Sequence, residues 1–351
     1  MVFPPVKLAV FGVGRWGVNL LRTFLALPSV EVVAVADPRP EQLTQVQQQF
    51  GLPETVTLTS DWTAALELAG LEAIAIATPA ATHAEIITAA LQKRLHVMVE
   101  KPLTLDYQGC LDLCQLAKQV NRQLVVDHTY LFHPAVQQGR QLLEADKLGT
   151  LRYGYAARTN LGPVRLDVDA LWDLAIHDIA IFNYWLGQSP CCVTAKGQSW
   201  LQPKAHQPPH FSQGLADAVW LTLTYANGFQ AQIHLCWANP DKQRKLAVVG
   251  DRGTLVFNEM TPDMPLKIQQ GQFERQGPWF VPTGLAVDAI ALSQAEPLKQ
   301  ACQHFAECTA QQAPSPISSG AVGASLVRIL AALSQSLANG GSPVDLVADL
   351  A

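Results

Sequence analysis

The sequence predicts two domains: an N-terminal α/β domain with a parallel sheet and a C-terminal α+β domain with an open, predominantly antiparallel sheet. Its 351 residues, 49% of them hydrophobic, exceed what one ordinary core holds. Short apolar runs alternate with amphipathic stretches in the first third of the chain, whereas closely spaced strands and turns dominate afterwards. We therefore expect domains at residues 1–126 and 127–351.

A parallel strand that is buried on both faces corresponds to a short continuous apolar run in the sequence, and the N-terminal third contains five such runs. Helical patterns separate these runs and end where expected: residues 16–27 stop before Pro28, and residues 41–50 stop before Gly51. This alternation is typical of βαβ units. The expected strands are 7–11, 30–36, 73–77, 96–100 and 123–126.

The second half of the chain contains turn sequences that are typical of β-hairpins. Asn227-Gly228 and the segment 250–253 lie between alternating strands and supply residues that tolerate positive φ. Two helical stretches, 296–311 and 320–338, come near the end of the chain. The expected strands are 151–160, 192–200, 216–225, 229–237, 245–249 and 254–257.

Composition excludes several classes of partner. A net charge of −5 with 15% charged residues provides no basic stripe for nucleic acid. No apolar run reaches the roughly 20 residues of a membrane helix, and no signal peptide opens the chain, so we expect a cytoplasmic protein without a membrane partner. The seven cysteines lack the paired CxxC spacing of zinc ribbons, so we expect reduced thiols and no metal site.

A glycine-rich turn, Gly12-Val13-Gly14-Arg15-Trp16-Gly17, directly follows the first predicted strand and opens a helix. In this context Gly12 permits the tight turn, Gly14 lets the backbone approach a pyrophosphate, and Gly17 lets the helix pack closely on the sheet. Arg15 and Trp16 complete the loop. The pattern predicts a dinucleotide-binding Rossmann domain, the alternative being a plain glycine turn.

Asp37 ends the second predicted strand, twenty residues after Gly17. A carboxylate at this position accepts hydrogen bonds from the ribose hydroxyls and repels a 2′-phosphate, which favours NAD over NADP. Arg39 leaves NADP open, since it can turn toward a 2′-phosphate. The alternative for Asp37 is a solvated turn residue before Pro38.

The loop after the strand 73–77 contains Thr78, Pro79 and His83. Open α/β sheets bind ligands at the carboxyl ends of their strands, so Thr78 and His83 are candidates for contact with ribose or nicotinamide. In the alternative interpretation, Thr82 simply caps the helix that begins there.

Glu100-Lys101-Pro102 follows the next strand, which places a lysine on the same sheet edge as the glycine-rich loop. A lysine beside a nicotinamide ring can exchange a proton with a substrate hydroxyl. Lys101 is therefore the first catalytic candidate, with Glu100 beside the cofactor. In the alternative interpretation, Lys101-Pro102 is an ordinary exposed segment at the end of a strand.

Asp173 and His177 lie four residues apart in an apolar helix over residues 171–182, which predicts a buried helix with both side chains on one face. The carboxylate can then orient the imidazole and hold its tautomer while His177 contacts a substrate hydroxyl. The alternative is a structural Asp-His pair, but the predicted cofactor site favours catalysis.

Four further polar residues near the predicted domain boundary are candidates for binding substrate hydroxyls or a phosphate. Each is also compatible with an ordinary surface position. They are Tyr130, Arg158, Asn160 and Arg165.

These motifs, in this order, resemble the glucose-fructose oxidoreductase / inositol dehydrogenase / rhizopine catabolism (Gfo/Idh/MocA) family over nearly the whole chain. The resemblance implies a Rossmann domain followed by a domain built on an open sheet, which in this family commonly supports dimers or tetramers. It also implies that Lys101 handles the proton, that His177 faces the substrate, and that Asp173 orients the site while hydride passes between a sugar carbon and NAD.

A closer likeness connects the chain to family members that oxidise UDP-N-acetylglucosamine or its uronate at C3. The resemblance implies an NAD-dependent dehydrogenase acting on a secondary hydroxyl of a sugar or nucleotide sugar. Two alternatives stay open: an NADP-linked reductase of a sugar, inositol or other small carbonyl compound, and a non-catalytic nicotinamide-binding sensor or scaffold. The likeness is carried by 160–162, Arg165, 167–168, 172–175, 297–298, 304–305, Pro314 and 318–320.

Overall fold

The computed structural model describes residues 4–202 and 214–346. The chain divides into two compact units, one made of Met1–Phe132 with Ala295–Val327 and the other of His133–Gln294 with Arg328–Ala351. The first division lies close to the expected boundary at 126/127. Residues 295–327 were expected in the C-terminal domain, but they belong to the N-terminal unit.

The first unit is built on a six-stranded sheet in the order β3-β2-β1-β4-β5-β6, with every neighbouring pair parallel. This order confirms the predicted Rossmann α/β class, and the five expected strands are found within one or two residues. A short sixth strand, β3, was not expected. The strands are β1 (Val6–Phe11), β2 (Val30–Ala36), β3 (Thr57–Thr59), β4 (Ala73–Ile76), β5 (His96–Glu100) and β6 (Leu124–Asp127).

Helices connect these strands and complete the core of the first unit. The helix after β2 ends at Gly51, whose φ of 58° is the left-handed conformation that stops a helix. The helix that follows residue 296 packs on the first helix and on β1. These helices are α1 (Gly17–Leu25), α2 (Pro40–Phe50), α3 (Trp62–Ala65), η1 (Ala80–Thr82), α4 (His83–Gln92), α5 (Tyr107–Val120), η2 (Thr129–Phe132) and α8 (Pro297–Gln311).

The second unit is built on a nine-stranded sheet in the order β14-β13-β12-β11-β7-β10-β9-β8-β15. Only its β7–β10 pair is parallel among the described residues, which confirms the predicted open, predominantly antiparallel sheet. The strands are β7 (Leu151–Leu161), β8 (Cys192–Gln198), β9 (Ala218–Thr224), β10 (Gln230–Cys236), β11 (Ala238–Gly250), β12 (Gly253–Asn258), β13 (Leu266–Gln276), β14 (Trp279–Ala289) and β15 (Val344–Asp345).

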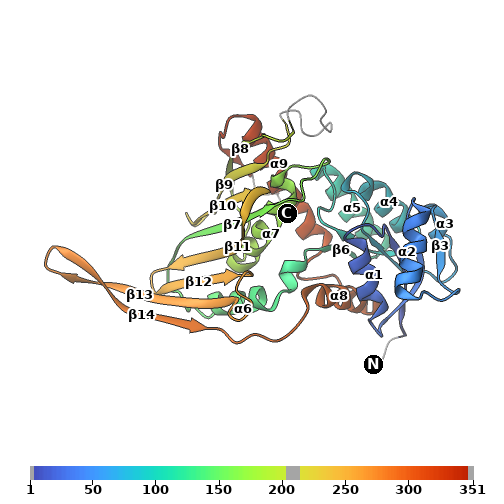
Figure 1. The fold of residues 1–351 in the computed structure, drawn as a ribbon, viewed down its shortest axis with the longest axis horizontal. Helices are drawn as coiled ribbons and strands as arrows, with labels where there is room; N and C mark the ends of the chain where they lie inside the picture. Colours follow the sequence, from blue (N-terminus) through green and yellow to red (C-terminus); the bar gives the residue numbers. More distant parts are fainter. Residues whose placement is uncertain (1–3, 203–213, 347–351) are drawn as a thin grey trace. The chain divides into compact units, whose positions relative to one another are not determined.

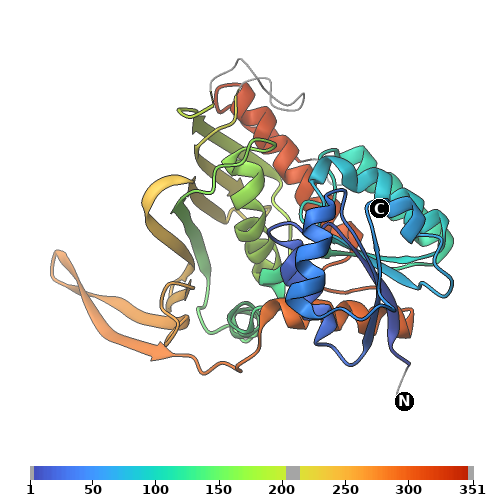
Figure 2. The same ribbon diagram turned by 45° about the vertical axis from the view of Figure 1, so that its right-hand side comes forward.

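One face of the nine-stranded sheet packs against helices. The apolar helix begins with a π-helical turn, η3 (Leu171–Ala175), and continues as α7 (Ile176–Leu186), the green helix that lies along the sheet in Figure 2. Its side chains are largely buried, as predicted. Phe182 of α7 packs so closely on β7 that a Cβ on Gly154 would lie 2.6 Å from its ring. The helix α6 (Pro134–Glu144) packs on α7, and Ser336 of α9 (Gly320–Ala338) accepts a hydrogen bond from β8.

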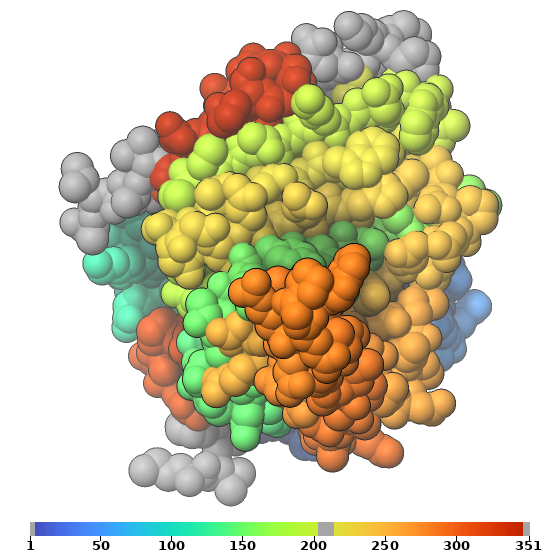
Figure 3. Space-filling view, turned by 90° about the vertical axis from the view of Figure 1, so that its left-hand side faces the viewer, coloured from blue at the N-terminus to red at the C-terminus, as the bar shows by residue number. Residues whose placement is uncertain are grey.

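The hairpin formed by β13 and β14 extends beyond the rest of its sheet as a two-stranded arm (Figures 1 and 3). Its strands were not expected, because polar residues interrupt the apolar alternation over 267–276. The arm carries large exposed apolar side chains: Phe273, Trp279, Phe280, Leu285 and Val287.

Within the described part of the chain, α9 is the one helix that is long and apolar enough to cross a membrane by length and composition. Half of its apolar window is buried inside the molecule. A core helix of a globular unit has the same length and composition.

Candidate active site

The glycine-rich loop connects β1 to α1 and needs glycine for steric reasons. Gly12 has φ +83°, and a Cβ there would lie 2.8 Å from the carbonyl oxygen of Ala77. A Cβ on Gly17 would overlap the carbonyl oxygen of Gly12. Gly14 has open space apart from the Arg39 guanidinium at 3.5 Å. A tight, side-chain-free turn at a helix N-terminus fits a pyrophosphate, so the residues present fit a dinucleotide.

We expect Gly17→Ala to lower both stability and NAD affinity, because its new methyl group displaces the backbone at Gly12. The thermal midpoint should fall by several degrees, and the Kd for NAD should rise by about tenfold or more. Gly14→Ala is the matched control: it should keep the midpoint of the cofactor-free protein and lose NAD affinity. Scanning calorimetry and NADH fluorescence measure the two quantities, and an unchanged midpoint for Gly17→Ala would contradict the steric argument.

Asp37 lies at the end of β2, 2% exposed, and its carboxylate is held by the loop and by Arg39. It accepts the Val13 N–H at 2.9 Å, and both Nε and Nη2 of Arg39 donate to it at 2.9 Å. Burial raises the pKa of Asp37, but the hydrogen bonds from Arg39 and Val13 outweigh it and lower the pKa below its usual value. Asp37 is therefore an anionic acceptor rather than a solvated turn residue.

We expect Asp37→Ala to shift cofactor preference toward NADP. The change removes the anion that repels a 2′-phosphate and releases the Arg39 guanidinium, whose side chain is 50% exposed. The ratio of the Kd for NADPH to the Kd for NADH should fall by about tenfold or more. Fluorescence titration with both cofactors measures it, and Glu41→Ala, an exposed acid in the first turn of α2, is the control. An unchanged ratio would remove Asp37 from cofactor selection.

The loop after β4 is fixed by hydrogen bonds of its own. His83 is 1% exposed, and its Nδ1 faces the carbonyl oxygen of Pro102 at 2.9 Å while its Nε2 faces that of Thr78 at 3.0 Å. The hydroxyls of Thr78 and Thr82 lie 2.7 Å apart, and Thr82 donates to Pro79. His83 thus ties the Thr78-Pro79 loop to the segment that follows Lys101, and its predicted contact with the cofactor stays a prediction.

Lys101 follows β5, so it lies on the same edge of the six-stranded sheet as the glycine-rich loop after β1. Glu100 precedes it and is buried, and its Oε2 accepts the backbone N–H of Lys101 at 3.2 Å. Arg15 and Trp16 are exposed in the loop, and Tyr130 is half-buried in η2. The predicted residues of the first unit, apart from Tyr130, therefore gather at the carboxyl ends of β1, β2, β4 and β5.

Sequence analysis missed Asp127, a buried carboxyl at the end of β6. It stands beside Glu100 in the parallel register of β5 and β6. The order of the strands could have revealed Asp127, because an acidic residue at the end of the strand beside β5 lies on the same edge of the sheet as Lys101.

In the second unit, Asp173 lies in the π-helical turn and pairs with Arg165, whose Nη1 is 3.2 Å from Oδ1. Arg165 also binds Asp167, from Nη2 to Oδ2 at 2.6 Å. Arg165 thus contacts two carboxylates of its own unit, and its predicted contact with substrate stays a prediction. His177 is half-buried in the first turn of α7. The orienting role predicted for Asp173 toward His177 stays a prediction.

Two other residues predicted to bind substrate are engaged inside the second unit. Arg158 is 3% exposed and forms a two-point ion pair with Asp178, both bonds at 2.9 Å. The guanidinium therefore joins β7 to α7, and the predicted contact of Arg158 with substrate stays a prediction. Asn160 donates to the Gly162 carbonyl and accepts from Arg244, so its amide also serves local structure.

Comparison with known proteins identifies the family of the chain. Residues 6–128 match the Gfo/Idh/MocA model described as an oxidoreductase family with an NAD-binding Rossmann fold. Residues 136–256 match the C-terminal domain model of the same family. A crystal structure of a "putative oxidoreductase" from Magnetospirillum magnetotacticum MS-1 is 33% identical, with a TM-score of 0.76, covering 94% of this chain and 99% of that one.

Two curated relatives name specific activities. The chain is 28% identical over 232 residues to UDP-N-acetylglucosamine 3-dehydrogenase of Acidithiobacillus ferrooxidans (65% of this chain, 66% of the relative). It is 27% identical over 216 residues to scyllo-inositol 2-dehydrogenase (NAD(+)) of Bacillus subtilis (60% and 62%). Both alignments span slightly less than two thirds of the relative. With models of both domains matched, the chain belongs to the Gfo/Idh/MocA family of NAD-binding oxidoreductases.

Proposed function

We propose that this protein is an NAD-dependent dehydrogenase that oxidises a secondary hydroxyl of a sugar or nucleotide sugar to a ketone. The observation that carries the proposal is the position of Lys101, which follows β5 on the sheet edge that also presents the glycine-rich loop and Asp37. A cofactor held by that loop brings its nicotinamide to this edge of a Rossmann sheet. A lysine there is suited to proton exchange with an alcohol.

In the proposed reaction, Lys101 takes the proton of the substrate hydroxyl onto Nζ. NAD, when bound, would supply the acceptor for the hydride that leaves the carbon bearing this hydroxyl. His177 donates or accepts a hydrogen bond at a substrate hydroxyl. Asp173, held by Arg165, supports the helix turn that precedes His177. The backbone at Gly14 would hold the pyrophosphate, in the turn that Gly12 and Gly17 make possible, and Asp37 would accept hydrogen bonds from the ribose hydroxyls.

The substrate class that we favour is UDP-N-acetylglucosamine or its uronate, oxidised at C3. The motifs shared with such members and the similarity to a UDP-N-acetylglucosamine 3-dehydrogenase support it. The test mixes purified protein with NAD and either nucleotide sugar, adds a 2-oxo acid to recycle held cofactor, and follows the reduced nicotinamide and the 3-keto product. Turnover supports the substrate class, whereas reaction with inositols or free sugars alone would exclude it.

The two alternatives predict different outcomes of the same assay. An NADP-linked reductase consumes NADPH with a keto compound and prefers NADPH in titrations, which the pairing of Arg39 with Asp37 disfavours. A non-catalytic sensor binds NAD but oxidises none of the nucleotide sugars, inositols and free sugars tested. Cofactor titration and the substrate panel separate all three.

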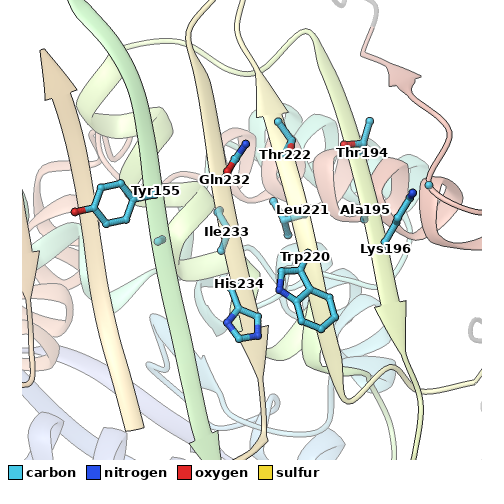
Figure 4. Close-up of a pocket in the computed structure, with 12 residues that line it drawn as sticks. Tyr155, Thr194, Ala195, Lys196, Trp220, Leu221, Thr222, Gln232, Ile233 and His234 are labelled. Carbon is cyan, nitrogen blue, oxygen red and sulfur yellow. The ribbon is translucent and has the colours of Figure 1, made fainter. Parts of the chain in front are cut away.

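We further propose that two copies of the chain associate through the face of the nine-stranded sheet opposite α7, as a homodimer or as half of a homotetramer. Aromatic and polar side chains project from this face around a shallow hollow of about 400 Å³ (Figure 4). Trp220 stacks on His234 with their ring centroids 5.0 Å apart. Five strands of about seven residues make a flat footprint of roughly 550 Å². Projecting side chains enlarge it toward the roughly 800 Å² per partner of a stable interface.

Trp220→Glu should convert the oligomer to a monomer, because the change places a charge at the centre of the proposed interface. Light scattering during gel filtration measures the mass. Trp279→Glu, on the exposed arm, is the matched control and should leave the mass unchanged. Dissociation by the arm variant alone would assign the interface to β13 and β14.

A further inference from the structure

The segment 168–182 leaves only two of its residues accessible. Asp173 and His177 are half-buried, and every other residue of the segment is buried. Their four-residue spacing places them on one side of the helix. The helix begins with the π-helical turn η3, a form that is rare in helices and frequent at functional sites. The side of the helix that His177 occupies is therefore the side that a ligand can reach.

Two contacts join the opposite part of α7 to the strand β7. The Nε and Nη2 atoms of Arg158 donate to the carboxylate of Asp178, both at 2.9 Å, and the two side chains are 4% and 3% exposed. One helical turn later, the ring of Phe182 lies so close to Gly154 that a Cβ there would be 2.6 Å from it. Asp178 and Phe182 are four residues apart on the helix, as are Gly154 and Arg158 on the strand, so each pair shares one face of its element. These contacts define the face of α7 that rests on the sheet.

The ion pair fixes the rotation of the first turn of α7 about the helix axis. A planar guanidinium that donates two N–H groups to one carboxylate sets a direction as well as a distance, which a single point charge does not. Successive residues of an α-helix are rotated by about 100°. With Asp178 held against β7, the preceding residue His177 is turned by this angle away from the strand. Any rotation of the turn that loosened the pair would also move the imidazole.

We propose that Arg158 and Asp178 are positioning residues, which hold the imidazole of His177 at the substrate hydroxyl by fixing the first turn of α7 on β7. This inference deepens the proposed function and rests on it for the role of His177. Neither side chain exchanges a proton in this role. Arg165 and Asp173 join the preceding π-helical turn to its loop, with 3.2 Å between Nη1 and Oδ1. One arginine–aspartate pair thus secures the helix before His177, and another secures it after.

The test replaces the buried pair by apolar residues of similar volume, Arg158→Met together with Asp178→Leu. Such replacements are often neutral or stabilising, so the midpoint of thermal denaturation should stay within a few degrees of the wild type. The directional bonds are lost, and kcat/KM for hydroxyl oxidation should fall by about 10- to 10²-fold, the effect of a small displacement of a group at the reacting centre. The Kd for NAD should not change. Arg158→Lys, which keeps the charge without the two-point geometry, is the second variant and should lose rate in the same direction.

A double-mutant cycle with His177→Ala separates positioning from a general loss of structure. In the His177→Ala background the pair has no imidazole to position, so the further loss of kcat/KM should be below about twofold. Tyr225→Phe is the matched control, because it removes the 3.0 Å hydrogen bond from Tyr225 Oη to Asn183 in the second half of α7. It should keep the wild-type rate. Equal losses with and without His177, in either pair variant, would overturn the proposal.

The placement of His177 is also measurable without substrate or cofactor, by NMR spectroscopy of protein labelled at histidine. The ring signals of His177 are assigned by their absence in His177→Ala. They should shift or broaden in the Arg158→Met, Asp178→Leu variant, whereas the signals of His234 on the other face of the nine-stranded sheet should stay. Unchanged His177 signals in the folded variant would overturn the positioning role. Absence of dehydrogenase activity in the wild type would remove the proposed function, and the NMR result would still decide whether the pair positions His177.

Discussion

Replacing Lys101 with alanine is expected to lower kcat/KM for hydroxyl oxidation by about 10²–10⁴-fold, the usual contribution of a positioned general base. The substrate hydroxyl must lose its proton as hydride departs, and the variant leaves only water to accept it. NAD affinity should change little, because the pyrophosphate and the ribose contact the glycine-rich loop and Asp37. Absorbance of reduced nicotinamide gives the rate, and fluorescence titration gives the Kd.

The control for this experiment is Lys93→Ala. Lys93 lies on the surface with its side chain 48% exposed, 2.6 Å from Glu67, and belongs to no predicted site. It should retain wild-type turnover. A Lys101→Ala protein that reacts as fast as the wild type would show that another group accepts the proton, and the proposed mechanism would fall.

Asp178→Ala is expected to destabilise the second unit more than any surface change. Its partner Arg158 keeps its charge in the core of this unit, and both side chains are at most 4% exposed. Removing one member of a buried ion pair costs about 3–5 kcal/mol, since the remaining charge stays desolvated and unpaired. The midpoint of thermal denaturation should fall by about 10 °C.

Glu144→Ala provides the comparison for Asp178→Ala, because Glu144 pairs with Arg140 at 2.7 Å on the exposed side of α6. Surface pairs contribute little, so its midpoint should move by about 1 °C or less. Calorimetry of the two variants side by side measures the difference. Equal midpoints would mean that Arg158 finds another anion or solvent, and that the pair does not hold β7 to α7.

Sequence patterns predicted the elements whose local chemistry and burial agree. Five parallel strands were predicted correctly because they are mostly apolar, whereas the three-residue strand β3 was missed. The helix α2 ends at Gly51, as predicted, because glycine adopts the left-handed conformation there. The arm of β13 and β14 was missed, since a ribbon exposed on both faces has no apolar alternation to detect. The π-helical turn at 171–175 was read as ordinary helix, because hydrophobic periodicity does not distinguish the two.

The sequence by itself determined the fold class, the cofactor loop and the candidate lysine, because each depends on residues that are contiguous in the chain. Only the tertiary structure decided which polar residues were already engaged. In the structure Arg158 pairs with Asp178, His83 contacts the carbonyl oxygen of Pro102, and Asp127 lies beside Glu100 on the neighbouring strand. A side chain's partner depends on strand order and helix packing over separations of about 20 residues or more, and a single sequence carries no local signal for such contacts.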